Sequence, residues 1–191
     1  KINLKEFDLE HKEARKWGIT EVPTLLLDPK KYNIRWLGAP MGEEARSFVE
    51  AMLMLGYGTT SISEESRQVL DKIDSPRKIK VFVSPTCPYC PQQVVNALKA
   101  AIEKPDLISL EIIDIQANPE LADQYGAQSV PQAYANEQLI AMGAQQEVLF
   151  MASLEKLEQQ NIFIPESDAD EVEADHIILA RQLVNLGGVL M

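Results

Sequence analysis

Both cysteines of the chain stand in one stretch, Ser84-Pro85-Thr86-Cys87-Pro88-Tyr89-Cys90-Pro91, directly after the apolar run Ile79–Val83. A Cys-x-x-Cys pair that leaves a strand and opens a helix is typical of a dithiol–disulfide site. The spacing suits that chemistry because one thiolate attacks a disulfide, and the second thiol, one helical turn away, resolves the mixed disulfide. The stretch therefore predicts a strand, a redox site and a helix, in that order.

Two other interpretations of the cysteine pair are a half-complete metal site and a pair of small buried apolar residues. A structural zinc would need two further ligands. The two histidines, His11 and His176, stand alone in polar contexts, and there is no second Cys-x-x-Cys. We therefore expect no metal, and both histidines at the solvated surface.

The net charge of −11 argues against nucleic acid as a partner, because the phosphate backbone attracts clustered Lys and Arg. No apolar run approaches the roughly 18 residues of a membrane span, and the N-terminal residues show no signal-peptide core. We therefore expect no membrane partner. Both cysteines belong to one motif and none is left for a structural disulfide, which favours a reducing, cytoplasmic location.

The chain also repeats itself. Trp17-Gly18 and Val22-Pro23 recur as Tyr125-Gly126 and Val130-Pro131, each 108 residues further on. After each Val-Pro, the pattern predicts a short strand, a turn, a second short strand ending in Gly-Ala, and an amphipathic helix. We interpret this as two copies of one unit.

The second copy contains every element of the unit. Its predicted order is a strand over 79–84, a helix over 88–104, a strand over 109–114, a helix over 119–125 capped by Asn118, a hairpin over 132–142 and a helix over 145–159. A strand, a helix and a strand in series form a parallel βαβ unit, and the hairpin adds antiparallel strands. The predicted fold class is α/β, with a central mixed sheet flanked by helices.

The first copy has only its latter half. We expect a partial unit over 1–56, a linker with a helix over 57–76, the redox domain over 77–160, and an acidic tail with a C-terminal helix over 161–191. The linker helix would begin at the capping box Ser61–Glu64 and run to Asp74. A first copy beginning at Ile2 would lack its opening strand and helix, so we expect residues to be missing on the N-terminal side. Whether those residues hold their own Cys-x-x-Cys stays open.

These features resemble the thioredoxin superfamily, and within it the glutaredoxin-like, two-domain protein disulfide oxidoreductases. The resemblance rests on Pro-Thr-Cys-Pro-Tyr-Cys-Pro after a strand, on Val-Pro before the next-but-one strand, and on a second such unit upstream with its own Val-Pro. It covers about Ile2 to Gln160. It implies tandem thioredoxin-like folds, the first of them incomplete.

The resemblance also implies roles for the two cysteines. Cys87 would be the exposed attacking thiol and Cys90 the buried resolving thiol, with Pro88 and Tyr89 as the residues between them. Free N–H groups and the positive end of a helix dipole at Cys87 would stabilise its thiolate. The cysteine pair itself would carry the electrons, so no cofactor is expected.

Further roles concern the substrate. Thr86, Val130 and Pro131 would contact it, with Pro131 in the cis form facing the cysteine pair. The Val130 backbone would then offer strand-like pairing to a substrate peptide.

Two departures from the relatives bear on function. Glutaredoxins that bind glutathione usually have Gly-Gly and an Asp where this chain has Gly143–Glu147, so we expect no glutathione binding. Thioredoxins keep a buried Asp where this chain has Val81. Proton transfer at Cys90 must then use water or another carboxylate, which the sequence does not identify.

Three functions compete. The first is a thiol–disulfide oxidoreductase acting on protein disulfides, recharged by a thioredoxin-reductase-like or flavin-dependent reductant, with a glutaredoxin-like potential of about −200 to −230 mV. The second is an electron-relay module resembling the N-terminal region of alkyl hydroperoxide reductase flavoproteins. The third is a partner-binding scaffold in which the cysteines are incidental. Direction of electron flow, substrate and oligomeric state stay open.

Overall fold

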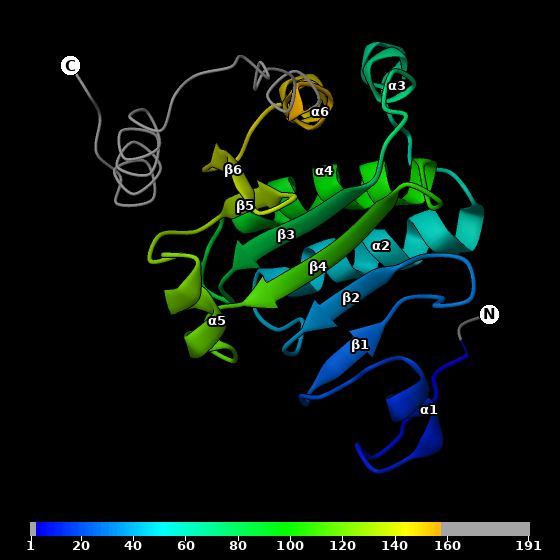
Figure 1. Ribbon diagram of the computed structural model, residues 1–191, viewed down its shortest axis with the longest axis vertical. Coiled ribbons are helices and arrows are strands. Elements are labelled where there is room, and N and C mark those ends of the chain that lie inside the picture. The colour runs from blue at the N-terminus through cyan, green and yellow to red at the C-terminus, as the bar shows by residue number, and fades with distance from the viewer. Residues whose placement is uncertain (1–2, 158–191) are drawn as a thin grey trace, which may run out of the picture. The chain divides into compact units, whose positions relative to one another are not determined.

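The computed structural model describes residues 3–157, and its central feature is a six-stranded sheet with the order β1-β2-β4-β3-β5-β6 (Figure 1). The strands, in chain order, are β1 (Thr24–Leu26), β2 (Ile34–Leu37), β3 (Arg77–Val83), β4 (Ile108–Asp114), β5 (Gln132–Ala135) and β6 (Gln138–Met142). The strands β2, β4 and β3 run parallel, whereas β1–β2, β3–β5 and β5–β6 are antiparallel pairs. The expected mixed sheet, with a parallel βαβ unit and an added hairpin, is confirmed.

Six helices belong to the described residues: α1 (Lys12–Lys16), α2 (Glu44–Tyr57), α3 (Glu64–Leu70), α4 (Cys90–Glu103), α5 (Pro119–Gln124) and α6 (Glu147–Glu155). The two long helices, α2 and α4, lie side by side behind the sheet, and α3 packs against α6 (Figure 1). None of the helices within residues 3–157 has the length and apolarity needed to cross a lipid bilayer.

The core follows from alternation along the strands and from helical spacing along α4. Ile79, Val81 and Val83 of β3 are buried in one large cluster with Val94 and Leu98 of α4. Because successive side chains of a strand point to opposite faces, the intervening residue belongs to the other face. There Phe82 joins a smaller cluster, whose further members are Ile113, Ala122, Ala127 and Tyr134.

Two expected helix caps are wrong in detail. The Asn118 side chain does not cap α5; its Nδ2 donates to the carbonyls of Leu37 and Asp114, each at 3.0 Å. A buried amide bonded to β2 and β4 satisfies more of its polar atoms than a single cap bond would. The cap of α3 is Ser63, whose hydroxyl accepts from the Ser66 N–H, and the helix ends at Leu70 rather than Asp74.

The two Val-Pro sites have the same local geometry. Val22–Pro23 and Val130–Pro131 are both cis. Gly38 N–H donates to the Pro23 carbonyl at 2.9 Å, and Gly143 N–H donates to the Pro131 carbonyl at 2.8 Å. This likeness supports the repeat. The strands β2 and β4, one from each predicted copy, pair directly within one sheet. The division into two copies and a linker therefore stays a prediction.

Two sequence expectations concern residues outside the redox motif. His11 is exposed, as expected, and its Nδ1 accepts from the Glu13 N–H at the start of α1. His176 and the expected tail and helix over 161–191 lie outside the described residues.

A partly buried ion pair holds α6 against α4 and the start of α3. Glu147 carboxylate oxygens accept from Lys99 Nζ at 2.5 Å and from the Ser63 N–H at 2.9 Å. Burial by itself would raise the pKa of Glu147, but the bonds from Lys99 and Ser63 outweigh it and lower the pKa to about 2. The ionised form is therefore favoured by folding.

We expect Glu147→Gln to lower the free energy of unfolding by about 1–2 kcal/mol at pH 7, because a charge-assisted hydrogen bond is lost. Because folding lowers this pKa, the stabilisation is complete above about pH 4.5 and disappears as the pH falls toward 2. Urea unfolding from pH 7 to pH 3 measures it. The matched control is Glu120→Gln, an exposed acid in the first turn of α5. An equal loss at pH 7 and pH 3 would contradict the assignment.

Candidate active site

The two cysteines form a disulfide at the point where β3 has ended and α4 begins. Cys87 and Cys90 are bonded, with their Cα atoms 5.5 Å apart. The Cys87 N–H donates to the Ser84 carbonyl at 3.0 Å, which turns the chain after β3. Cys90 is the first residue of α4, so the helix starts two residues later than the sequence predicted.

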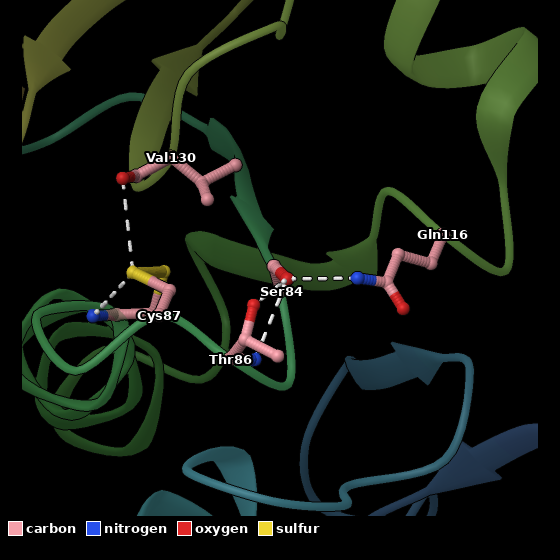
Figure 2. Close-up of a disulfide and its surroundings, with 6 residues drawn as sticks. Ser84, Thr86, Cys87, Gln116 and Val130 are labelled. Atoms are coloured by element: carbon pink, nitrogen blue, oxygen red, sulfur yellow. Dashed lines mark hydrogen bonds between the residues drawn. A yellow bond between two sulfur atoms is a disulfide. The ribbon is translucent and has the colours of Figure 1, made fainter.

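The start of α4 directs an N–H group at the first sulfur. The Cys90 N–H donates to Cys87 Sγ at 3.1 Å (Figure 2). The first N–H groups of a helix have no partner within the helix, and they lie at its positive end. In the reduced protein the same N–H is placed to stabilise a Cys87 thiolate.

The two sulfurs differ in access to solvent. Cys87 is 8% exposed and Cys90 is 0% exposed, so the first cysteine offers a small accessible surface and the second offers none. Between them Tyr89 is 70% exposed and Pro88 is also exposed. Cys87 is therefore the cysteine that an incoming disulfide can reach, although it is much less exposed than the sequence predicted.

The Val130–Pro131 corner faces the disulfide. Cys87 Sγ lies 3.7 Å from the Val130 carbonyl oxygen (Figure 2). The strand register explains this approach: Phe82 of β3 is paired with Gln132 of β5, so the residues just before Gln132 lie opposite the end of β3. The structure thus brings together Cys87, Cys90, Val130 and Pro131, as expected.

The loop between β3 and the disulfide is held by hydroxyl and amide groups. The hydroxyl oxygens of Ser84 and Thr86 are 3.2 Å apart, and Gln116 Nε2 donates to Ser84 Oγ at 3.2 Å (Figure 2). Thr86 therefore lies beside Cys87, but its hydroxyl is paired with Ser84. Ser84 and Gln116 were not identified from sequence, since a lone Ser and Gln carry no spacing signal.

The N-terminal end of α2 docks on the same loop. Glu43 N–H donates to the Pro85 carbonyl at 2.9 Å. Gly42 has a φ of +56°, and a Cβ there would collide with the Pro85 carbonyl oxygen. Only glycine fits this left-handed position at such close approach. The first half of the chain therefore contributes to the site.

Glu44, the first residue of α2, has a buried carboxyl group that the sequence analysis did not identify as functional. It is 0% exposed, and neither carboxyl oxygen has a hydrogen-bond partner. The nearby Ser47 hydroxyl donates to the Glu44 backbone carbonyl instead, at 3.0 Å. Burial, and then the charge of Asp114, raise the pKa of Glu44 to about 8. In sequence Glu44 resembles any acid in the first turn of a helix.

Glu44 lies close to the cysteine loop through two neighbours. Asp114 is paired with Val83, the last residue of β3, and Glu43 is bonded to Pro85. The pKa of the Glu44 carboxyl, about 8, is close to the ordinary pKa of a thiol.

Within residues 3–157 there is no group of three or more His, Cys, Asp or Glu that could hold a metal ion.

We expect the folded protein to lose stability as the pH rises from about 4.5 to about 8, because folding raises the pKa of Glu44 and the native state retains a proton that the unfolded chain has released. Glu44→Gln removes this dependence. Between pH 4.5 and pH 9 the free energy of unfolding of the variant should rise by about 4 kcal/mol relative to that of the parent. Urea unfolding of the oxidised proteins measures it, with Glu50→Gln on the exposed side of α2 as control. Parallel curves for the parent and the Glu44→Gln variant would refute a raised pKa.

The second half of the chain is similar to known thioredoxins. A family model described as thioredoxin domain matches residues 77–156. A probable thioredoxin of Methanothermobacter marburgensis is 42% identical over 82 residues, which are 42% of this chain and 96% of that protein. A thioredoxin of Methanocaldococcus jannaschii is 33% identical over 79 residues, or 41% of this chain and 93% of that protein.

Two solved structures extend the likeness to the first half of the chain. A protein disulfide oxidoreductase from Aeropyrum pernix has a TM-score of 0.70 at 26% identity, covering 82% of this chain and 69% of that one. The NTD_N/C domain of the alkylhydroperoxide reductase AhpF from Enterococcus faecalis has a TM-score of 0.66 at 26% identity, covering 76% of this chain and 72% of that one. Family match, relatives and fold agree, and this chain therefore belongs to the thioredoxin superfamily.

Proposed function

We propose that this protein is a thiol–disulfide oxidoreductase that exchanges disulfides of protein substrates through Cys87 and Cys90. One observation carries the proposal: the disulfide lies at the start of α4 with one accessible sulfur, 3.7 Å from a backbone carbonyl that can pair with a peptide. The likeness to a protein disulfide oxidoreductase supports the substrate class.

The reaction needs two exchanges and no other redox group. The Cys87 thiolate attacks one sulfur of a substrate disulfide, forming a mixed disulfide and releasing the other substrate sulfur as a thiolate. Cys90, as a thiolate, then attacks Cys87 Sγ, which breaks the mixed disulfide and releases the second substrate thiolate. The protein is left with the Cys87–Cys90 disulfide, and an external dithiol or reductase returns the two electrons.

The roles of the two sulfurs follow from their surroundings. Cys87 has the exposed surface and receives the Cys90 N–H, which stabilises its thiolate form. Cys90 is enclosed and must release its proton before it attacks. We assign Glu44 as the carboxyl that takes this proton when it is ionised, because it is buried without a hydrogen-bond partner and follows Glu43, which is bonded to the cysteine loop at Pro85. Its pKa of about 8 means that the ionised form increases as the pH rises above 7.

Replacing each cysteine by serine separates attack from resolution. We expect Cys87→Ser to abolish reduction of insulin disulfides in the presence of dithiothreitol, because no attacking thiolate remains. Cys90→Ser should instead accumulate mixed disulfides through Cys87, seen as covalent adducts on non-reducing gels and by mass spectrometry.

Glu44→Gln should slow release of the substrate above pH 7 while leaving adduct formation intact.

Two results would reject the proposal. Insulin reduction retained by the Cys87→Ser variant would remove Cys87 as nucleophile. Absence of adducts with the Cys90→Ser variant would favour the scaffold, in which the cysteines are incidental.

A second candidate function is an electron relay to a peroxiredoxin. The observation favouring it is the likeness to the N-terminal domain of an alkylhydroperoxide reductase. In this function the Cys87–Cys90 dithiol would reduce the disulfide of a peroxiredoxin, and a flavin-dependent reductase would recharge it.

The two candidates differ in substrate preference. A relay module should reduce an oxidised bacterial peroxiredoxin at least tenfold faster than insulin in single-turnover mixing, because its surface would be selective for one partner. A general oxidoreductase should show no such preference. Stopped-flow tryptophan fluorescence of the pre-reduced protein measures both rates.

A further inference from the structure

The loop between β6 and α6 is tied to both sides of the disulfide. At its start, Gly143 N–H donates to the Pro131 carbonyl at 2.8 Å. Two residues later, Gln145 N–H donates to Gln93 Oε1 at 3.0 Å, and the Gln145 carbonyl accepts from Asn96 Nδ2 at 3.0 Å. The loop therefore connects the Val130–Pro131 corner with helix α4.

The α4 side of this connection consists of two buried amides. Gln93 and Asn96 are each 0% exposed, on a helix face that otherwise carries apolar residues such as Val94 and Ala97. A buried amide is costly unless its polar atoms are bonded. Gln93 Oε1 is bonded to the loop, while its Nε2 has no partner. A residue that served only to fill the core would be apolar here.

These bonds connect α4 with the backbone that approaches the disulfide. Gln93 lies three residues after Cys90 in α4. From Gln93 the path runs through Gln145 and Gly143 to Pro131, and then to Val130, whose carbonyl oxygen lies 3.7 Å from Cys87 Sγ. The distance between the sulfur and the peptide-binding backbone is thus set from both sides.

We propose that Gln93 is a positioning residue for exchange with protein disulfides: through Gln145 and Gly143 it holds the Val130–Pro131 backbone where a substrate segment pairs while its disulfide meets Cys87. This inference rests on the proposed oxidoreductase function. Gln93 acts through the loop and not on either sulfur. Its effect therefore falls on protein substrates, which need the backbone corner, and not on small reagents, which need only the sulfur.

The test compares Gln93→Met with Gln124→Met. Methionine has a similar length, suits a helix and cannot accept the Gln145 N–H. Gln124 is the exposed last residue of helix α5, outside the bonds that join α4 to the loop. We expect Gln93→Met to raise the KM for insulin about fivefold, the effect of one net hydrogen bond. Its kcat and the alkylation rate of reduced Cys87 by iodoacetamide should stay within about twofold, and Gln124→Met should match the parent.

Amide hydrogen exchange provides a readout independent of turnover. The N–H groups of Gln145 and Gly143 should exchange faster in Gln93→Met and at the parent rate in Gln124→Met. If Gln93→Met does not fold, Asn96→Ala removes the other bond to Gln145, and the same rise in KM and faster exchange are expected.

Three outcomes overturn the inference. Faster exchange at Gln145 with an unchanged KM means that the tether does not position the substrate-binding backbone. A fall in kcat and alkylation rate that parallels the rise in KM means that Gln93 acts on the sulfur itself. A parent protein without insulin reductase activity removes the proposed function first, and this result is distinct because it appears before any variant is compared.

Discussion

The site depends on the position of β3 at the centre of the sheet, hydrogen-bonded to β4 on one side and β5 on the other. The pairing of Phe82 with Gln132 brings the Val130–Pro131 corner opposite the end of β3, where the cysteine loop begins. A slip of one residue would move the corner by about 3.3 Å and turn its side chains to the other face. The 3.7 Å approach of Cys87 Sγ to the Val130 carbonyl is a consequence of that register.

The surroundings of the disulfide come from local and distant groups. The Cys90 N–H reaches Cys87 Sγ within a single turn of the chain. Two contacts join segments far apart in the sequence: the N-terminal end of α2 presents Glu43 to Pro85 and buries Glu44, and the loop after β6 binds Gln93 of α4. The first half of the chain thus contacts the cysteine loop, while β2 extends the sheet and α2 packs against α4.

The likenesses differ in how much of the chain they cover. The thioredoxin family model matches residues 77–156, where the cysteine pair and the Val130–Pro131 corner lie, and the two thioredoxins reported above match 42% and 41% of the chain. The structures that cover more of the chain are a protein disulfide oxidoreductase and an alkylhydroperoxide reductase domain. Helix α2, which contacts the cysteine loop, lies outside the residues that the thioredoxin family model matches.

Local spacing let the sequence by itself determine the redox pair, the βαβ unit, the hairpin and the Val-Pro corner, because neighbouring residues encode strands, helices and turns directly. A local pattern failed where a side chain had a partner far along the chain: Asn118 bonds Leu37 instead of capping α5. The cap of α3 differs only by a local shift of two residues, from Ser61 to Ser63. Glu44 showed no signal at all. Its burial, and so its proton affinity, exists only after α2 docks on the Pro85 loop, because desolvation is a property of the packed structure and not of the residue.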